Sequence, residues 1–257
     1  MIANYHTHTR RCRHADGTER EYVERAIEGG LKILGFSDHS PYPFPEGYDS
    51  GMRMRLDQVE DYVDTVLALR KEYEKDIEIH LGLETEYFPK FWDQLIDFLS
   101  DYPFEYFLLG QHSLGNEIEK ILYSGRGTTE EKYLKQYVDQ CLAGLDTGKY
   151  LYLAHPDLFR FDGDEAVFDR EYRRLCREVK KRNIPLEINF LGLMEERWYP
   201  NERFWKIAGE EGNTAVFGCD AHTPKAVWNP ETEQKALLLA EKYGLEVQKT
   251  VPMPKTF

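Results

Sequence analysis

The chain has 257 residues, of which 41% are hydrophobic and 31% are charged. That length can bury the core of one large α/β domain, so we expect an ordinary globular protein. The formal net charge of −13 disfavours a nucleic-acid polymer or an anionic membrane as partner, because either polyanion would repel the protein. The four cysteines show no CxxC spacing, which predicts reduced and mostly buried thiols.

No apolar run approaches the roughly 18 residues that a membrane-spanning helix needs. The first apolar run already carries histidines, which leaves no room for a signal peptide ahead of it. Together these features predict a cytoplasmic protein.

Short apolar, β-rich runs alternate with longer amphipathic stretches along the chain. We expect strands at residues 2–6, 32–37, 77–84, 105–110, 151–154, 185–190 and 214–218. We expect helices near residues 18–29, 55–75, 89–100, 129–146, 165–182, 201–211 and 232–243. A capping box between Thr18 and Glu21 is expected to open the first helix. This alternation predicts a parallel sheet, and seven repeats favour a barrel over an open doubly wound sheet.

Seven of the eight histidines fall at or soon after the ends of these strands. They are His6, His8, His14, His39, His112, His155 and His222. Strand side chains alternate with a period of two, so His6 and His8 point to the same side and can bind one ion. Glu84 and Asp220 add carboxylates, the anionic ligands that bridging two divalent metals requires. Strand ends of an α/β barrel meet on one face, so the pattern predicts a polynuclear metal site.

Taken singly, these residues have plainer interpretations. The Asp38-His39 pair alone fits a helix cap beside a surface histidine. Glu86 fits a solvated carboxylate. His80 lies inside its strand, and we expect it in the core or behind the ligands. Only the joint pattern favours the metal site.

The joint pattern resembles the motif set of the PHP (polymerase and histidinol phosphatase) family over the whole chain. The matching motifs are His6-Thr7-His8-Thr9, His14, Ser37-Asp38-His39, Gly82-Leu83-Glu84, His112, Ala154-His155-Pro156 and Cys219-Asp220-Ala221-His222. The resemblance is greatest to the stand-alone histidinol-phosphate phosphatases of that family. It implies a distorted, TIM-like (β/α)7 barrel and a single metallophosphatase domain spanning residues 1–257.

The resemblance also implies three divalent ions, of zinc, manganese or iron. The first would take His6, His8, Glu84 and Asp220, the second Glu84, His112 and His155, and the third His14, His39 and His222. A hydroxide between the first two ions is expected to attack phosphorus, while the third ion stabilises the leaving alkoxide. Glu84, Asp220 and His222 are thus the expected catalytic residues. Asp16, Asp220 or a metal-bound water could protonate the alkoxide.

Arginines recur in the loops of the presumed active face, and a guanidinium matches the oxygens of a phosphate. They are Arg10, Arg11, Arg13, Arg53, Arg55, Arg126, Arg160 and Arg197. We expect Arg160 and Arg197 to contact the phosphate, with a surface ion pair as the alternative for each. Aromatic side chains of residues 40–45, with Trp198 and Tyr199, could form walls around an imidazole ring.

The resemblance favours hydrolysis of L-histidinol phosphate to L-histidinol and phosphate, in histidine biosynthesis. Two alternatives stay open at this point. The chain could be a PHP phosphoesterase acting on nucleotides or another small phosphomonoester, which the acidic net charge does not exclude. It could instead be a non-catalytic metal-binding module, against which the complete set of ligand positions argues.

Overall fold

The structure is a computed structural model that describes residues 1–254 of the chain. Eight parallel strands form one sheet in the order in which they occur along the sequence. They are β1 (Ala3–Asn4), β2 (Ile33–His39), β3 (Glu78–Glu84), β4 (Tyr106–Leu109), β5 (Tyr150–Leu153), β6 (Leu186–Asn189), β7 (Thr214–Gly218) and β8 (Glu246–Val247). The first seven coincide with the expected strands, and β8 is an additional short one.

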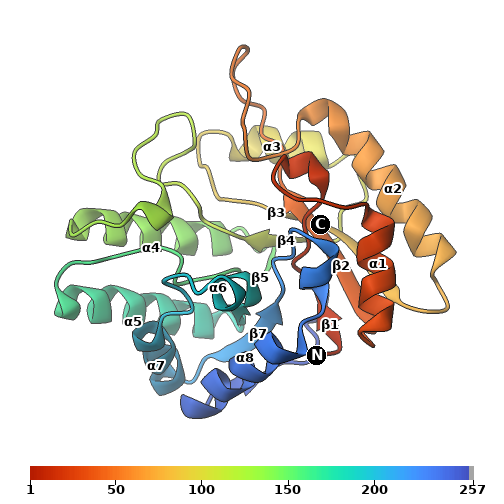
Figure 1. Ribbon diagram of the computed structural model, residues 1–257. Coiled ribbons are helices and arrows are strands. Elements are labelled where there is room, and N and C mark those ends of the chain that lie inside the picture. Colours follow the sequence, from red (N-terminus) through yellow and green to blue (C-terminus); the bar gives the residue numbers. More distant parts are fainter. Residues whose placement is uncertain (255–257) are drawn as a thin grey trace.

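Helices cover the outer face of the sheet, with α1 and α2 on one side and α4 and α5 on the other (Figure 1). The α-helices are α1 (Glu19–Glu28), α2 (Val59–Glu72), α3 (Trp92–Leu99), α4 (Glu131–Leu145), α5 (Glu165–Lys181), α6 (Phe190–Met194), α7 (Glu202–Glu211) and α8 (Pro230–Lys242). All but α6 were expected. The capping box of Thr18 and Glu21 at the start of α1 is confirmed.

The sheet curls into a distorted, TIM-like half-barrel, as the resemblance implied. The chain just beyond β1 meets the chain just beyond β7 through a parallel bridge between Thr7 and Ala221. The backbone N–H of His8 donates to Ala221 O at 3.0 Å, and that of Ala221 donates to His6 O at 3.2 Å. This bridge brings the first and seventh repeats together at the carboxyl ends of the strands.

Tyrosines fill the interior of the sheet beneath that end. Tyr5, Tyr106 and Tyr152 are buried in one apolar cluster, and Tyr106 donates a hydrogen bond to Tyr5 O at 2.8 Å. A Cβ at Gly35 would lie 2.2 Å from the Tyr106 hydroxyl, and a Cβ at Gly82 would lie 2.4 Å from the Tyr106 ring. These two glycines therefore make room for the tyrosine layer that supports the strand ends.

A second, larger cluster of buried side chains fills the space between the sheet and the helices. The four cysteines are free and buried, as expected (Cys12, Cys141, Cys176 and Cys219). Within residues 1–254, no helix is both long and apolar enough to cross a membrane.

Candidate metal centre

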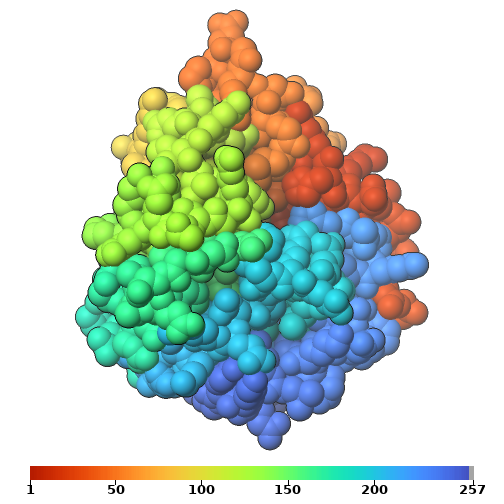
Figure 2. All heavy atoms as spheres, turned by 60° about the vertical axis from the view of Figure 1, so that its left-hand side comes forward, coloured from red at the N-terminus to blue at the C-terminus, as the bar shows by residue number. Residues whose placement is uncertain are grey.

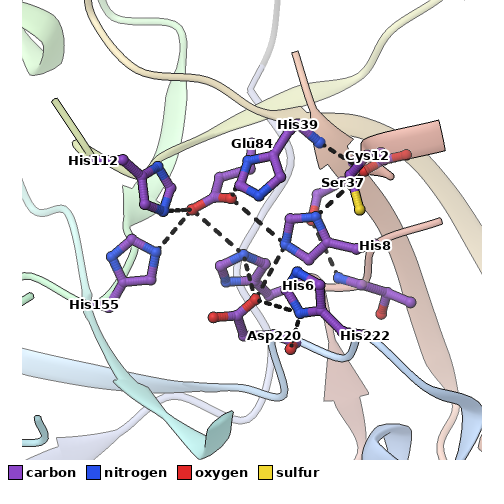
Figure 3. Close-up of polar contacts among 12 residues, drawn as sticks. His6, His8, Cys12, Ser37, His39, Glu84, His112, His155, Asp220 and His222 are labelled. Atoms are coloured by element: carbon purple, nitrogen blue, oxygen red, sulfur yellow. Dashed lines mark hydrogen bonds and ion pairs between the residues drawn. The ribbon is translucent and has the colours of Figure 1, made fainter. Parts of the chain in front are cut away.

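The nine predicted ligands gather at the carboxyl ends of the strands, although they come from six separate parts of the chain. All of them except His14 are labelled in Figure 3. His39 and Glu84 are the last residues of β2 and β3. The others follow the ends of strands β1, β4, β5 and β7 and are His6, His8, His14, His112, His155, Asp220 and His222. Parallel strands align their carboxyl ends on one edge, so sequence-distant ligands become neighbours.

Glu84 lies at the middle of this group, between the imidazoles on either side of it (Figure 3). Its two oxygens face different histidines. Oε1 lies 2.8 Å from His155 Nε2 and 3.6 Å from both His6 Nε2 and His112 Nε2, whereas Oε2 lies 3.0 Å from His39 Nδ1 and 3.5 Å from His8 Nε2. A carboxylate whose oxygens serve two sets of imidazoles has the arrangement of a bridging ligand.

Asp220 provides the second carboxylate of the centre. Its Oδ1 lies 3.1 Å from His8 Nε2, 3.6 Å from His6 Nε2 and 3.4 Å from His222 Nδ1. Burial alone would raise the pKa of Asp220, but the neighbouring His6 and His8 hold it well below its usual range. Asp220 is therefore ionised at neutral pH.

Groups of three ligand atoms lie within 4.8 Å of one another at several places in the cluster. The groups are His14-His39-His222, His6-His8-Glu84, His6-His155-Asp220, His39-Glu84-His112 and His8-Cys12-His222. The first of these is the set expected for the third ion. The ligand sets expected for the first and second ions are not separate in the structure, because Glu84 and His6 each lie close to residues of both sets. Nothing in the sequence indicated that the sulfur of Cys12 would lie beside His8 and His222.

Several buried atoms of this cluster have no hydrogen-bond partner within the described part of the chain. They are Nε2 of His6 and His8, Nδ1 of His39 and His155, and Oε2 of Glu84. A buried polar atom without a partner costs about 1–3 kcal/mol, so a fold does not gather five of them without compensation. All five are imidazole nitrogens or carboxylate oxygens, the ligand atoms that divalent metals bind once any proton on them is released, and the residues therefore fit a polynuclear metal site.

Three further carboxylates lie behind the cluster, each against the Nδ1 of one histidine. Glu187 is 2.7 Å from His6, Glu86 is 3.3 Å from His112, and Asp38 is 3.4 Å from His8. A carboxylate on Nδ1 fixes the proton there and turns a basic Nε2 toward the metal, which orients the ligand and raises its basicity. Glu187 was absent from the sequence-based predictions.

Glu86 is not the solvated carboxylate that the sequence allowed. Only 1% of its surface is exposed, and it receives two hydrogen bonds from Arg53, both at 3.0 Å. Arg53 is itself 2% exposed and also donates to Glu117 at 2.8 Å. Arg53 therefore supports the ligand His112 through Glu86 and is not available to a phosphate.

His80 lies outside the centre, as expected. Its Nε2 is 3.0 Å from Glu78 and its Nδ1 is 3.2 Å from Glu105, both away from the ligand cluster. The interpretation of Asp38-His39 as a helix cap is wrong, because both residues are buried at the end of a strand.

The histidines divide into two electrostatic groups. Burial opposes a charge on His6, but Glu187, Asp220 and Glu84 outweigh it and raise its pKa to about 10. Burial and the neighbouring His8 lower the pKa of His39 to about 4 and that of His222 to about 3. His39 and His222 are thus neutral at physiological pH, the form in which an imidazole coordinates a metal.

A pocket of about 270 Å³ opens above the ligands. Besides six ligand residues it is lined by Met52, Tyr123, Leu158, Leu191, Glu195, Arg197 and Tyr199. The segments near residues 110–125 (yellow-green) and 190–200 (cyan) face each other across this side of the molecule (Figure 2). The pocket can hold a small molecule, whereas a nucleic-acid polymer would need an extended groove.

Of the two arginines expected at the phosphate, Arg197 lines this pocket and Arg160 does not. Arg197 is 2.6 Å from Glu195 and donates to the Tyr199 hydroxyl at 2.9 Å. Arg160 lies 3.1 Å from Asp162 and lines a neighbouring pocket, which Arg197 also borders.

Three of the remaining loop arginines are paired with carboxylates instead of being free for a phosphate. Ion pairs join Arg11 to Glu19 and Asp61, Arg13 to Asp49, and Arg55 to Asp57. The aromatic wall agrees with the expected one at Tyr199 and differs elsewhere. Tyr42 and Phe44 pack against Phe88 and line a separate pocket, while Tyr123 and Tyr199 border the metal centre.

Comparisons with known proteins agree with this geometry. The sequence model of the PHP domain matches residues 4–190. A probable histidinol-phosphatase of Deinococcus radiodurans is 28% identical over 243 residues, covering 88% of each chain. The histidinol-phosphatase of Bacillus subtilis is 28% identical over 254 residues, covering 84% of this chain and 92% of that one.

Solved structures show the same fold. The histidinol phosphate phosphatase of Lactococcus lactis, crystallised with zinc, L-histidinol and phosphate, superimposes with a TM-score of 0.72 at 22% identity, covering 97% of this chain and 96% of that one. A putative histidinol phosphatase of Listeria monocytogenes gives a TM-score of 0.70 at 21% identity, covering 87% and 96%.

Proposed function

This chain belongs to the PHP family of phosphoesterases, and from that membership we propose that it hydrolyses L-histidinol phosphate to L-histidinol and phosphate. A probable histidinol-phosphatase of Deinococcus radiodurans and the histidinol-phosphatase of Bacillus subtilis match it over most of their length. At 28% identity, these matches support the proposed substrate. The observation that carries the proposal is the cluster of nine ligands, most of them buried, beneath a pocket of small-molecule size.

We propose that the cluster holds three divalent ions, of zinc, manganese or iron. His14, His39 and His222 would hold one of them, as a compact group at the edge of the cluster. Glu84 would bridge the other two, with His6, His8 and Asp220 as the further ligands of one ion and His112 and His155 as those of the other, although His6 lies at the same Glu84 oxygen as His112 and His155. Bound there, such ions lower the pKa of a water and neutralise phosphoryl oxygens.

The residues of the chain itself have separable roles in this proposal. Glu187, Asp38 and Glu86 keep three ligating imidazoles in the tautomer that presents Nε2 to the centre. Because Asp220 is ionised, it can accept a proton at Oδ1 but has none to give. The proton donor to the leaving alkoxide is therefore sought elsewhere, in Asp16 or a water molecule.

Arg197 is the proposed phosphate contact within the pocket. Its guanidinium is held between Glu195 and the Tyr199 hydroxyl, and the side chain is 33% exposed, so it can reach a ligand. Arg160 is proposed as a second contact, from the neighbouring pocket that Arg197 also borders. Met52, Leu158 and Leu191 offer the apolar wall that the imidazole ring of the substrate requires.

The test is phosphate release from L-histidinol phosphate by the metal-loaded protein, beside sugar phosphates, mononucleotides and p-nitrophenyl phosphate. We expect kcat/KM above about 10⁴ M⁻¹s⁻¹ for L-histidinol phosphate and much lower values for the rest. Equal, slow turnover of every compound would refute the substrate and favour another small phosphomonoester. A preparation that binds no metal would refute the metal centre as well.

The arginine roles can be tested in the same assay. Replacing Arg197 with Ala should raise KM for L-histidinol phosphate, and Arg160→Ala should do so less, because Arg160 lies farther from the ligands. A guanidinium–phosphate contact corresponds to about 10- to 100-fold in kcat/KM. Either substitution that changes neither KM nor kcat removes that arginine from the site.

A further inference from the structure

Glu195 is the residue of the pocket wall that the phosphatase chemistry leaves unexplained. Apart from the ligand Asp220, it is the carboxylate among the described residues that line the pocket. A carboxylate at the mouth of a phosphate-binding site repels the dianion it should admit. Its presence makes sense where the ligand carries a positive charge close to its phosphate.

The segment that carries Glu195 is fixed in place. It follows α6, and Asn189 caps the first turn of that helix. The Asn189 side chain accepts a hydrogen bond from the backbone N–H of Gly192 at 3.0 Å. The backbone N–H of Glu195 closes the helix by donating to Leu191 O, and that of Arg197 donates to Gly192 O, both at 3.0 Å. The carboxylate is thus presented from a defined turn.

The pairing of Glu195 with Arg197 leaves part of the carboxylate available. Nε and Nη2 of Arg197 lie 2.8 Å and 2.6 Å from the same oxygen, Oε2. Oε1 accepts no hydrogen bond within residues 1–254, and the side chain is 53% exposed. A cation can therefore bind at Oε1 while Arg197 keeps its own contact.

Arg197 and Glu195 together present a positive and a negative group side by side at the pocket. L-histidinol phosphate has the complementary pattern, because its ammonium-bearing carbon is directly attached to the carbon that carries the phosphate ester. We propose that Glu195 binds the substrate ammonium through Oε1 while Arg197 contacts the phosphate. The enzyme would then select phosphomonoesters of amino alcohols. This inference rests on the proposed function.

The experiment compares Glu195→Gln with the parent enzyme on two substrates. One is L-histidinol phosphate, and the other is 3-(imidazol-4-yl)propyl phosphate, which lacks only the amino group. A charge-assisted hydrogen bond corresponds to about 10- to 100-fold in binding. We expect that loss in kcat/KM for L-histidinol phosphate, mainly through KM, and little change for the des-amino compound.

Glu202→Gln is the matched control, since Glu202, on α7, is also an exposed glutamate in an ion pair, 2.8 Å from Lys242. It should behave as the parent enzyme does on both substrates. An equal loss on both substrates in Glu195→Gln would mean that Glu195 acts only by orienting Arg197, and would overturn the inference. An unchanged kcat/KM on both would overturn it too. A parent enzyme inactive on L-histidinol phosphate would instead refute the proposed function, and the inference with it.

Discussion

Replacing Glu187 with Gln should cost metal affinity without unfolding the protein. The Glu187 carboxylate is completely buried and has four polar neighbours. Its Oε1 lies 2.7 Å from His6 Nδ1 and accepts from the Tyr152 hydroxyl at 3.2 Å. Its Oε2 accepts from the backbone N–H of His155 at 2.9 Å and from Asn189 Nδ2 at 3.0 Å.

A glutamine cannot satisfy these neighbours in either orientation. With its oxygen toward His155 and Asn189, its NH₂ group faces His6 Nδ1 and makes that nitrogen the acceptor. The ring proton must then move to Nε2, which can no longer bind a metal. With the amide reversed, its NH₂ group faces two other donors, the backbone N–H of His155 and the Asn189 side chain. Loss of such an outer partner costs about 10- to 100-fold in metal affinity, or about 1.4–2.7 kcal/mol.

The measurement is a titration of metal-free protein with zinc against a competing chelator, with circular dichroism to confirm that the variant is folded. Tyr152→Phe is the control, because it removes one contact to Glu187 but leaves the one to His6 intact, and its zinc affinity should stay within about threefold of the parent. If Glu187→Gln were folded and bound every equivalent of zinc as tightly as the parent protein, the orienting role of Glu187 would be wrong.

Three other perturbations test the support of the centre. Glu86→Gln should lower the free energy of unfolding at pH 7 by about 3–5 kcal/mol, because Arg53 loses a buried partner. Burial would raise the pKa of Glu86, but Arg53 holds it well below its ordinary value of 4.5. The stabilisation is therefore present above pH 4.5 and is lost as the pH falls. In urea unfolding, the difference in free energy between parent and variant should be smaller at pH 3 than at pH 7. Gly110→Ala would place a Cβ 1.8 Å from Glu84 Oε1 and should abolish activity, while Gly51→Ala, with nothing within 4 Å of its Cβ, should not. Removing metal with a chelator should lower the melting temperature of the protein, and adding zinc should restore it. A melting temperature that does not change would contradict the claim that bound metal stabilises the fold.

The seven main strands could be predicted because each is an apolar run followed by a longer amphipathic stretch. The two missed elements are too short for that argument. Helix α6 has five residues and β8 has two, whereas a periodic pattern becomes recognisable over about 11–18 residues. Residues 190–200 were expected as a loop, and the side chain of Asn189, which caps α6, gave the available signal.

The gathering of the nine proposed metal ligands could be predicted because the ends of the strands can be recognised in the sequence. The carboxylates behind them could not be, because nothing in the spacing says which histidine a carboxylate will meet. Glu187 did leave a signal: Leu186 and Ile188 alternate with Glu187 and Asn189 within one short strand. A charged residue on the inward face of a strand is rarely buried unless it has a partner.

The arginines show how composition misleads about a site. The chain has 46 acidic and 33 basic residues, so an arginine in an acidic protein readily finds a carboxylate nearby. Arg11, Arg13 and Arg55 are paired in this way and leave little free positive charge at the centre. Attraction of a phosphate dianion then depends on the proposed contacts Arg197 and Arg160 and on the metal ions of the proposed centre.

The interior tyrosines connect the fold to the geometry of the centre. Tyr152 is part of the buried cluster beneath the strand ends, and its hydroxyl donates to the carboxylate that orients His6. Tyr106 donates to the backbone carbonyls of Tyr5 and Phe36, at 2.8 Å and 3.1 Å. An aliphatic core would leave these acceptors unpaired, at a cost of about 1–3 kcal/mol each. The tyrosine layer therefore satisfies the polar groups below the ligands and holds their strands in register, so the positions of the imidazoles follow from the packing of the barrel itself.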